Sequence, residues 1–273
     1  MTVRPQADIS GNKPLYPLIS VITVVLNSKN LIEQTIKSVL YQDYPNIEYI
    51  VIDGGSVDGT IEIINSYKSK LKFFLSEPDL GIYYAMNKGL LIAKGDWVNF
   101  MNSGDIFISN HTISNAAKEM NNSVDILYGS VEINYYNFLR TEEAGSPKNL
   151  WKGMQFSHQS IFVNLPYHKK NLFNANIKIV GDLEFFYKAY KNNLRFKNLK
   201  QTVSQVSIGG LSETNRYKTI TSSCKVICEG KVKPIIRIYY AIQIFNLFFK
   251  KLIKIILPKT LIRKLILMKH ISK

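Results

Sequence analysis

The chain has 273 residues, of which 46% are hydrophobic, so it is long enough to bury a substantial core. Its formal net charge of +15 is uneven: after Glu229 there are 11 of the 35 cationic residues and no acidic residue, whereas the preceding part holds 24 cationic and 20 acidic residues. Because the excess charge belongs to the tail, and no helix-turn-helix, zinc finger or aromatic RNA platform is recognisable, we expect no nucleic-acid partner. The two cysteines, without a cluster of histidines or further cysteines, favour a reduced compartment and no structural zinc.

Three apolar runs with strand-like composition alternate with segments of helical period. The first 17 residues contain three prolines and no hydrophobic period, so we expect a loose lead-in. The strand-like runs are residues 18–26, 49–52 and 97–101, and the helical segments are residues 32–40, 61–71 and 82–94, the last with Ile82, Ala85 and Met86 at the start of its buried face. This alternation predicts an α/β fold of three α/β/α layers, in which helices cover both faces of a mostly parallel sheet. Ligands of such sheets bind outside the carboxyl ends of the strands, so we expect the function in the loops that follow these runs.

These loops and the helix between them belong to a longer pattern. It comprises residues 31–60, which end in Asp53-Gly54-Gly55-Ser56-Val57-Asp58-Gly59-Thr60, then residues 76–89, and then the stretch from Gly95-Asp96-Trp97 to Asn102-Ser103-Gly104-Asp105. The pattern resembles family 2 glycosyltransferases, in the branch that serves bacterial polysaccharide biosynthesis, and it continues more thinly to Leu211. The resemblance implies a GT-A-like, nucleotide-sugar-binding catalytic domain, which we place at residues 18–229.

The resemblance implies that the loops after the strands bind a nucleotide-sugar donor. Asp53 would accept hydrogen bonds from the base or ribose, Gly54 and Gly55 would let the backbone approach the ligand, and Asp79 would face the sugar or diphosphate. The expected donor-binding residues are Val25, Asn27, Asp53, Gly54, Gly55, Ser56, Asp79, Lys88 and Asn102. The residues alone leave another interpretation open. The loop after the second run would then be an ordinary turn, and the acidic residues before Ile82 would complement the positive end of a helix.

The resemblance also implies a divalent metal, Mg²⁺ or Mn²⁺, that bridges the diphosphate of the donor. The family usually has an Asp-x-Asp cluster after the third run, because hard cations prefer oxygen ligands. Here the four positions read Asn102-Ser103-Gly104-Asp105, so only the last acidic position is present. We therefore expect Asp105 to be the metal ligand and Asn102 to contact ribose or water. The alternative is that Asp105 is a turn or N-cap residue.

An inverting transferase needs a general base to take a proton from the acceptor hydroxyl. The family supplies it from an acidic pair at a helix start in the second half of the domain, and the matching residues here are Asp182 and, as the second candidate, Glu184. Asp182 could equally be a helix N-cap. On the acceptor side we expect His158 and Trp151, although a lone histidine beside a strand is more often structural.

The tail, residues 230–273, reads as two basic amphipathic helices divided by Pro258. Its longest charge-free run, residues 238–249, is 12 residues long, short of the roughly 20 needed to span a bilayer. Basic, aromatic-rich helices of this kind lie in the membrane interface, so we expect peripheral attachment to an anionic membrane, on the cytoplasmic face of the inner membrane. The alternatives are packing against the domain and pairing in a homodimer.

Together these features predict an inverting glycosyltransferase of cell-surface polysaccharide biosynthesis, such as that of O-antigen or capsule, which moves a sugar from a nucleotide-sugar to a lipid-linked or glycan acceptor. Two alternatives stay open. One is a sugar-phosphate nucleotidyltransferase, which would be expected to carry a glycine-rich loop after the first strand, where this chain has Asn27-Ser28-Lys29-Asn30. The other is a membrane-associated relative that binds nucleotide-sugar without catalysis.

Overall fold

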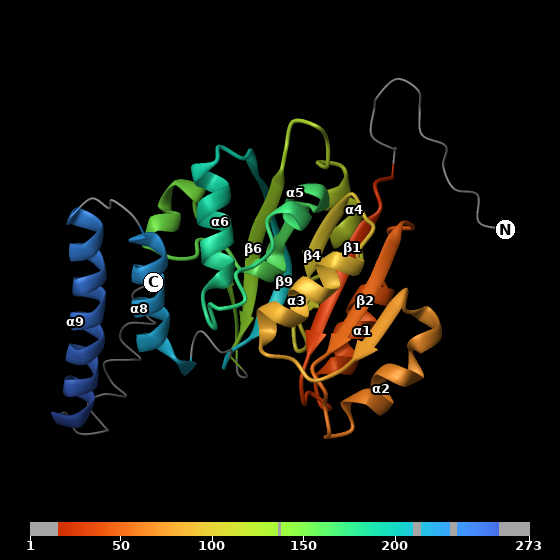
Figure 1. Ribbon diagram of the computed structural model, residues 1–273, viewed down its shortest axis with the longest axis horizontal. Coiled ribbons are helices and arrows are strands. Elements are labelled where there is room, and N and C mark those ends of the chain that lie inside the picture. The colour runs from red at the N-terminus through yellow and green to blue at the C-terminus, as the bar shows by residue number, and fades with distance from the viewer. Residues whose placement is uncertain (1–15, 136–137, 210–213, 230–233, 257–273) are drawn as a thin grey trace.

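The computed structural model describes residues 16–135, 138–209, 214–229 and 234–256 (Figure 1). The strands are β1 (Ile19–Val25), β2 (Ile47–Asp53), β3 (Phe73–Ser76), β4 (Trp97–Phe100), β5 (Ile106–Phe107), β6 (Ile126–Asn134), β7 (Leu139–Glu142), β8 (Ile161–Asn164) and β9 (Phe196–Ser207). The α-helices are α1 (Ile32–Leu40), α2 (Thr60–Ser66), α3 (Ile82–Ile92), α4 (Thr112–Ala117), α5 (Leu165–Lys170), α6 (Gly181–Lys191), α8 (Arg216–Ile227) and α9 (Pro234–Ile256). Short 3₁₀ turns are η1 (Lys68–Lys70), η2 (Pro147–Lys152) and η3 (His158–Ser160).

The strands form one sheet, and its topology brings the predicted loops together. The order is β3-β2-β1-β4-β8-β6-β9-β5, with β7 paired to β6. Strands β3, β2, β1 and β4 are mutually parallel, while β8 inserts antiparallel between β4 and β6. Val25 pairs with Asp53 and Ile22 with Phe100, so β1, β2 and β4 end at the same edge. The loops that follow them meet there.

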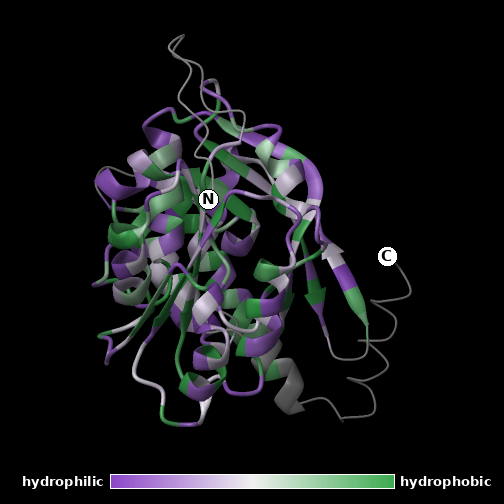
Figure 2. Cartoon of the chain, turned by 90° about the vertical axis from the view of Figure 1, so that its right-hand side faces the viewer, coloured by the Kyte–Doolittle hydropathy of each residue, from purple (hydrophilic) through white to green (hydrophobic). Residues whose placement is uncertain are grey.

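The core lies on both faces of this sheet, as the alternation of strand and helix predicts. All seven residues of β1 are buried, which explains its continuous hydrophobic run. Ile22 and Val24 join one cluster with residues of α3 and α6, whereas Ile19 and Val21 join another with residues of α1 and α4. The strands at the centre of the molecule are accordingly among its most hydrophobic segments in Figure 2. The three-layer prediction is confirmed.

Within residues 18–105 the structure differs from the predicted elements in three main respects. Strand β3, which the hydrophobic pattern did not indicate, is a short, partly exposed strand beside β2. Helix α2 ends at Ser66, earlier than expected, and the chain continues as η1. In α3, Ile82 is 37% exposed and Tyr83 is buried instead, because the Tyr83 ring packs against Gly181 and Phe173 from distant parts of the chain.

The first tail segment forms the single helix α9, which lies beside α8 at one end of the molecule (Figure 1). Tyr240 is buried, and its hydroxyl donates a hydrogen bond to the carbonyl oxygen of Trp151 at 3.0 Å. The first half of α9 is thus packed against the part of the chain that forms the sheet. No helix in the described ranges is long and apolar enough to cross a membrane. The second predicted tail helix and most of the expected lead-in lie outside those ranges.

The other side of α9 presents an apolar surface to solvent, which we call the outer stripe. Its residues recur at alternating intervals of three and four, which places them on one face of the helix. They are Ile235, Ile238, Ile242, Phe245, Phe249 and Leu252, each at least 51% exposed. One face of α9, which includes Tyr240, therefore packs against the rest of the chain. The outer stripe is exposed and can contact another surface.

Candidate active site

The loops after β1 and β2 are joined by hydrogen bonds into one rigid unit. The amide of Asn27 donates to Ser56 Oγ at 2.7 Å, and Asn27 Oδ1 accepts from the amide of Val57 at 2.9 Å. Asn27 has a φ of 48°, a left-handed conformation that asparagine tolerates better than most residues. The carbonyl of Val25 accepts the amide of Gly54 at 2.9 Å. Both expected donor loops are therefore positioned together before any ligand binds.

Asp53 is fully buried at the centre of this unit. Its carboxylate accepts the amides of Gly55 and Ser56 at 3.0 and 2.9 Å, Ser56 Oγ at 2.5 Å and Ser76 Oγ at 2.7 Å. Four donors occupy about as many sites as a carboxylate offers. A base or ribose that hydrogen-bonds to Asp53 has to share or displace them. Through these bonds Asp53 shapes the loop after β2.

The segment after β3 lies against this loop. Gly55 has a φ of 88°, and a Cβ atom there would lie 3.2 Å from the backbone nitrogen of Pro78, so this close approach requires glycine. A Cβ atom on Gly54 would lie 3.5 Å from Asp79 Oδ2. The structure thus gives Gly55 a packing role against the chain itself, in addition to the ligand approach that the resemblance implies.

Asp79, three residues before α3, forms an ion pair with the partly exposed Lys88 on that helix. Lys88 Nζ bonds to Asp79 Oδ1 and lies 2.7 Å from Glu77 Oε1, and both contacts, that with Asp79 above all, raise the pKa of Lys88. Only 7% of the Asp79 side chain is exposed, yet its Oδ2 atom has no hydrogen-bond partner among the described residues. A buried, unpartnered carboxylate oxygen is costly, and a ligand hydroxyl beside Gly54 would satisfy it.

The loop after β4 is a tight turn anchored on β1 and α1. The amide of Asp105 donates to the carbonyl of Asn102 at 3.0 Å, and Thr35 Oγ1 donates to the carbonyl of Asp105 at 2.8 Å. The Asp105 carboxyl accepts Gln159 Nε2 at 2.6 Å through Oδ2. Burial raises its pKa to about 7, against a usual 3.8, and the hydrogen bond from Gln159 opposes the shift.

His158 connects this turn to the start of α6. Its Nε2 atom lies 2.9 Å from Asn102 Nδ2, and its Nδ1 atom lies 3.7 Å from Asp182 Oδ2. Burial lowers the pKa of His158, and the charge of Asp182 opposes that shift. The imidazole is therefore neutral at pH 7. The structure places His158 between Asn102 and Asp182, so that the three side chains form a continuous line of neighbours. Asn102 and Asp182 are 80 residues apart in the sequence.

Asp182 is the second residue of α6, inside its first turn, and not the N-cap, which is Val180. Its Oδ1 atom accepts Tyr83 Oη at 3.1 Å and the amide of Leu183 at 2.9 Å. Glu184 faces elsewhere, because residues two apart on a helix lie on different sides. It is buried and accepts Lys188 Nζ at 2.7 Å. The geometry favours Asp182 over Glu184 for a role beside Asn102.

Trp151, expected on the acceptor side, lies in η2, which contacts the tail helix α9. Its ring meets the ring of Tyr239 edge-on at 5.3 Å, and its carbonyl binds Tyr240. Trp151 thus contacts α9 through both its ring and its carbonyl oxygen. This residue therefore joins the sheet-bearing part of the chain to α9.

Two residues of the site were missed by the sequence reasoning. Gln159, next to the expected His158, binds Asp105, and its own carbonyl is held by the buried Asn99 at 2.9 Å. Tyr83 binds Asp182 across 99 positions of sequence. A signal for Tyr83 was available in the glycine before Asp182, because Gly181 leaves room for an aromatic ring: a Cβ there would lie 2.9 Å from it.

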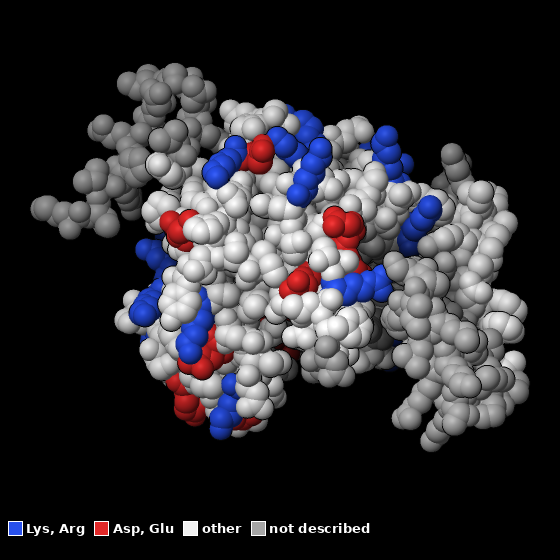
Figure 3. All heavy atoms as spheres, turned by 180° about the vertical axis from the view of Figure 1, so that it is seen from behind, with Lys and Arg blue, Asp and Glu red and all other residues white. Residues whose placement is uncertain are grey.

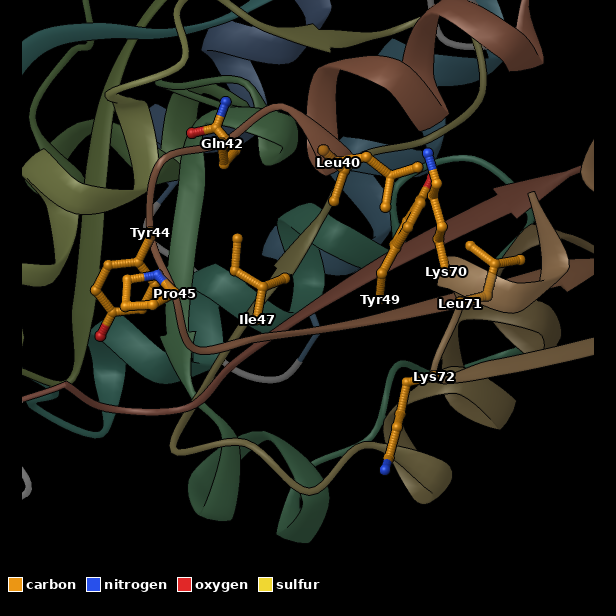
Figure 4. A pocket seen from close by; sticks show the side chains of 10 residues that line it. Leu40, Gln42, Tyr44, Pro45, Ile47, Tyr49, Lys70, Leu71 and Lys72 are labelled. Carbon is orange, nitrogen blue, oxygen red and sulfur yellow. The ribbon is translucent and has the colours of Figure 1, made fainter. Parts of the chain in front are cut away.

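A cavity of about 360 Å³ lies elsewhere, at the beginning of β2 and not at its carboxyl end (Figure 4). Its lining includes Tyr44, Ile47 and Tyr49, together with Lys70 and Lys72. Because β1 and β2 are parallel and in register, this cavity is at the opposite edge of the sheet from Asp53. It does not belong to the site described above.

Acidic and basic side chains lie side by side on the face in Figure 3, without a continuous basic surface there, which agrees with the near balance of charge before the tail. Within the described ranges, no group of three or more His, Cys, Asp or Glu side chains is arranged to hold a metal ion. A metal at this site would depend on Asp105 and on the ligand's own oxygens.

Residues 20–193 match the family model of glycosyl transferase family 2, and the chain therefore belongs to this family. It is 32% identical over 251 residues to an uncharacterized glycosyltransferase of Haemophilus influenzae, a match that covers 86% of this chain and 98% of the relative. It is 27% identical over 211 residues to a PGL/p-HBAD biosynthesis glycosyltransferase of Mycobacterium bovis, covering 72% and 80% of the two chains. The chain is a glycosyltransferase.

Solved structures show the same fold. TarS 1–349 of S. aureus, in complex with UDP-GlcNAc, aligns with a TM-score of 0.62 at 21% identity, over 85% of this chain and 73% of the TarS 1–349 chain. The mannosyltransferase PcManGT of Pyrobaculum calidifontis, in complex with GDP-Man and Mn²⁺, aligns with a TM-score of 0.63 at 17% identity, over 88% and 73% of the two chains. The predicted GT-A-type fold is confirmed.

Proposed function

We propose that this glycosyltransferase inverts the sugar it transfers, taking it from a nucleoside diphosphate sugar and attaching it to a lipid-linked or glycan acceptor. The observation that supports this most is the line from Asn102 through His158 to Asp182, which joins the expected donor edge to a carboxylate at a helix start. One carboxylate that acts as the general base, without a second one as nucleophile, suits direct displacement at the anomeric carbon. The two complexes named above contain UDP-GlcNAc and GDP-Man, which supports a nucleotide-sugar donor for this chain as well.

In the proposed reaction Asp182 acts as the general base. It takes the proton from the acceptor hydroxyl as the oxygen attacks the anomeric carbon, and the bond to the donor diphosphate breaks on the opposite side. The loops after β1 and β2 hold the nucleotide, and Asp79 Oδ2, buried and unpartnered in the described chain, takes a sugar hydroxyl. Lys88, kept protonated by Asp79 and Glu77, fixes that carboxylate in place. Preorganisation of this kind reduces the cost of orienting the two substrates.

The residues present fit a divalent cation held mainly by the ligand. Asn102 Oδ1 is buried without a partner in the described part of the chain, and Asp105 uses only Oδ2 in its bond to Gln159. Both are oxygen ligands of the kind that Mg²⁺ and Mn²⁺ prefer, and diphosphate oxygens would complete the shell. When bound, the cation would supply charge stabilisation for the departing diphosphate. The neighbour PcManGT contains Mn²⁺, which supports this proposal.

Metal binding at Asp105 is expected to depend on pH. The folded chain keeps a proton on Asp105 up to its pKa of about 7, whereas the unfolded chain releases it near 3.8. Without metal, the free energy of unfolding therefore falls as the pH rises between these values, while Mn²⁺ affinity rises, because Mn²⁺ requires the carboxylate. We expect binding of Mn²⁺ in the presence of UDP to be about tenfold tighter at pH 8 than at pH 6, measured by calorimetry. Asp105→Asn should remove this difference; an unchanged pH dependence would place the metal elsewhere.

We further propose that the enzyme works peripherally on the cytoplasmic face of the inner membrane, in cell-surface polysaccharide biosynthesis of the O-antigen or capsule type. The outer stripe of α9 and the 11 cations after Glu229 support contact with an anionic lipid surface. A lipid-linked acceptor would be presented at the same surface. The contact of Trp151 with α9 would place the tail next to the acceptor side of the domain.

A panel of nucleotide-sugars tests the proposed donor. A ligand at about 100 times its dissociation constant should raise the free energy of unfolding by roughly 2.7 kcal/mol, visible as a higher melting temperature. UDP-GlcNAc, GDP-mannose and other UDP-, GDP- and dTDP-sugars would be compared with Mn²⁺ and with chelator. The stabilising donor should then be hydrolysed slowly in the absence of acceptor. Stabilisation without any hydrolysis or transfer would support a non-catalytic relative, and the absence of stabilisation by every compound would contradict the nucleotide-sugar donor.

A further inference from the structure

We propose that Tyr83 is a positioning residue for the reaction, which holds one carboxylate oxygen of Asp182 so that the other takes the acceptor proton. The inference rests on the proposed function, because it takes Asp182 to be the general base. Tyr83 lies in the first turn of α3, whereas Asp182 begins α6 on a segment 99 residues further along. No feature of the family pattern assigned a role to this tyrosine.

The contacts of Tyr83 fix the orientation of the carboxylate. Its hydroxyl lies 3.1 Å from Asp182 Oδ1 and also 3.1 Å from the carbonyl oxygen of Ile179, and it accepts the amide of Asp182 at 3.3 Å. A hydroxyl has one proton, so it donates to only one of these two oxygens at a time. The carboxylate oxygen of Asp182 is a stronger acceptor than the carbonyl oxygen of Ile179, and the hydrogen bond to Asp182 is therefore preferred. Burial, followed by the nearby Asp182 charge, raises the pKa of Tyr83, so it stays a hydrogen-bond donor throughout the physiological range.

The two oxygens of Asp182 are thereby distinguished. Oδ1 is engaged by Tyr83 and by the amide of Leu183 at 2.9 Å. Oδ2 faces His158 Nδ1 at 3.7 Å, which is too long for a hydrogen bond. Asn102 Nδ2 donates to His158 Nε2, so the neutral ring carries its own proton on Nδ1. Nδ1 therefore cannot compete with Asp182 Oδ2 for the proton of the acceptor hydroxyl. The geometry leaves Oδ2 as the atom that accepts the proton.

The position of Tyr83 is itself determined by packing. The ring is 6% exposed, lies 5.4 Å from the ring of Phe173, and fills the space that a Cβ at Gly181 would occupy. A phenylalanine therefore keeps these contacts and loses only the hydroxyl. Tyr83→Phe should fold and bind donor like the unaltered chain, while Asp182 gains freedom to rotate. Because catalysis is sensitive to misplacement of this size, we expect kcat to fall about tenfold with KM for the donor unchanged within about twofold.

The test is a double-mutant cycle on the full chain, with hydrolysis of the nucleotide-sugar from the stabilisation panel as the activity. If Tyr83 acts through Asp182, then Tyr83→Phe combined with Asp182→Asn should be no slower than Asp182→Asn alone, since the effects of residues that act as a unit are not additive. Tyr49→Phe is the matched control. It removes another buried hydroxyl, 2.9 Å from Thr23 Oγ1, and should leave kcat within about twofold.

The same cycle measured by urea unfolding needs no donor. The urea concentration at the midpoint of unfolding should decrease less in the double variant than the sum of its decreases in the two single variants. Additive losses in both assays, or wild-type kcat in Tyr83→Phe, would overturn the inference. If the unaltered chain hydrolyses no donor, the proposed function is contradicted. If the two substitutions are still coupled in urea unfolding, the contact between Tyr83 and Asp182 nevertheless stands.

Discussion

Replacement of Asp182 by asparagine is expected to slow sugar transfer by about 10²-fold or more while donor binding is retained. Asparagine has the same shape and can still accept the hydroxyl of Tyr83 through its amide oxygen, but it cannot take a proton from the acceptor. The side chain is 16% exposed, so a change to a neutral amide should leave the fold intact. Transfer would be measured with radiolabelled donor, and donor affinity by the shift in melting temperature.

Glu184→Gln provides the contrast to this variant. Glu184 is buried and bound to Lys188, so its replacement should lower stability and leave most of the transfer activity. If Asp182→Asn transfers sugar at the wild-type rate and Glu184→Gln does not, the base has been assigned to the wrong residue. If Asp182→Asn fails to fold, the carboxylate has a structural role in the first turn of α6.

Removal of the outer stripe of α9 is expected to release the protein from anionic membranes. The variant carries Ile242→Ser, Phe245→Ser and Phe249→Ser, three residues that are 51% to 67% exposed and so are not needed for packing. Truncation at residue 230 would be a poorer test, because it also removes the buried Tyr240 from the domain. Liposome flotation should show binding of the unaltered chain, partial release at 1 M salt, where screening acts beyond about 3 Å, and near-complete loss in the variant.

A matched control replaces three exposed apolar residues elsewhere, Tyr41, Leu91 and Leu139, by serine. This control should float like the unaltered chain, and both variants should keep donor binding. Equal flotation of the stripe variant and the unaltered chain would rule out the membrane role of the stripe. If the variant instead loses a dimer seen by light scattering, the stripe is a contact between two copies of the chain.

Several features of this protein were determined by the sequence alone. The continuous apolar runs at 18–26, 49–52 and 97–101 became β1, β2 and β4, because a strand buried on both faces requires apolar residues throughout. Their spacing and the intervening helical period were enough to predict the layers, and the pattern through Asp105 was enough to indicate the family, which the match over residues 20–193 confirms. These are local signals, readable without knowledge of what lies opposite in space.

Only the tertiary structure decided which side chains meet. The donation of Ser76 to Asp53, the bond from Gln159 to Asp105 and the contact of Tyr83 with Asp182 join residues from different elements. In α3 the periodicity placed Ile82 inside, but packing against Gly181 and Phe173 buried Tyr83 instead. For the first tail segment the sequence predicted an amphipathic helix and left open whether it packs against the domain, and the contacts of Tyr239 and Tyr240 with Trp151 show which face of α9 is packed there. Such choices depend on partners about a hundred residues away in the sequence. The hydrophobic period of a single helix carries no information about these partners.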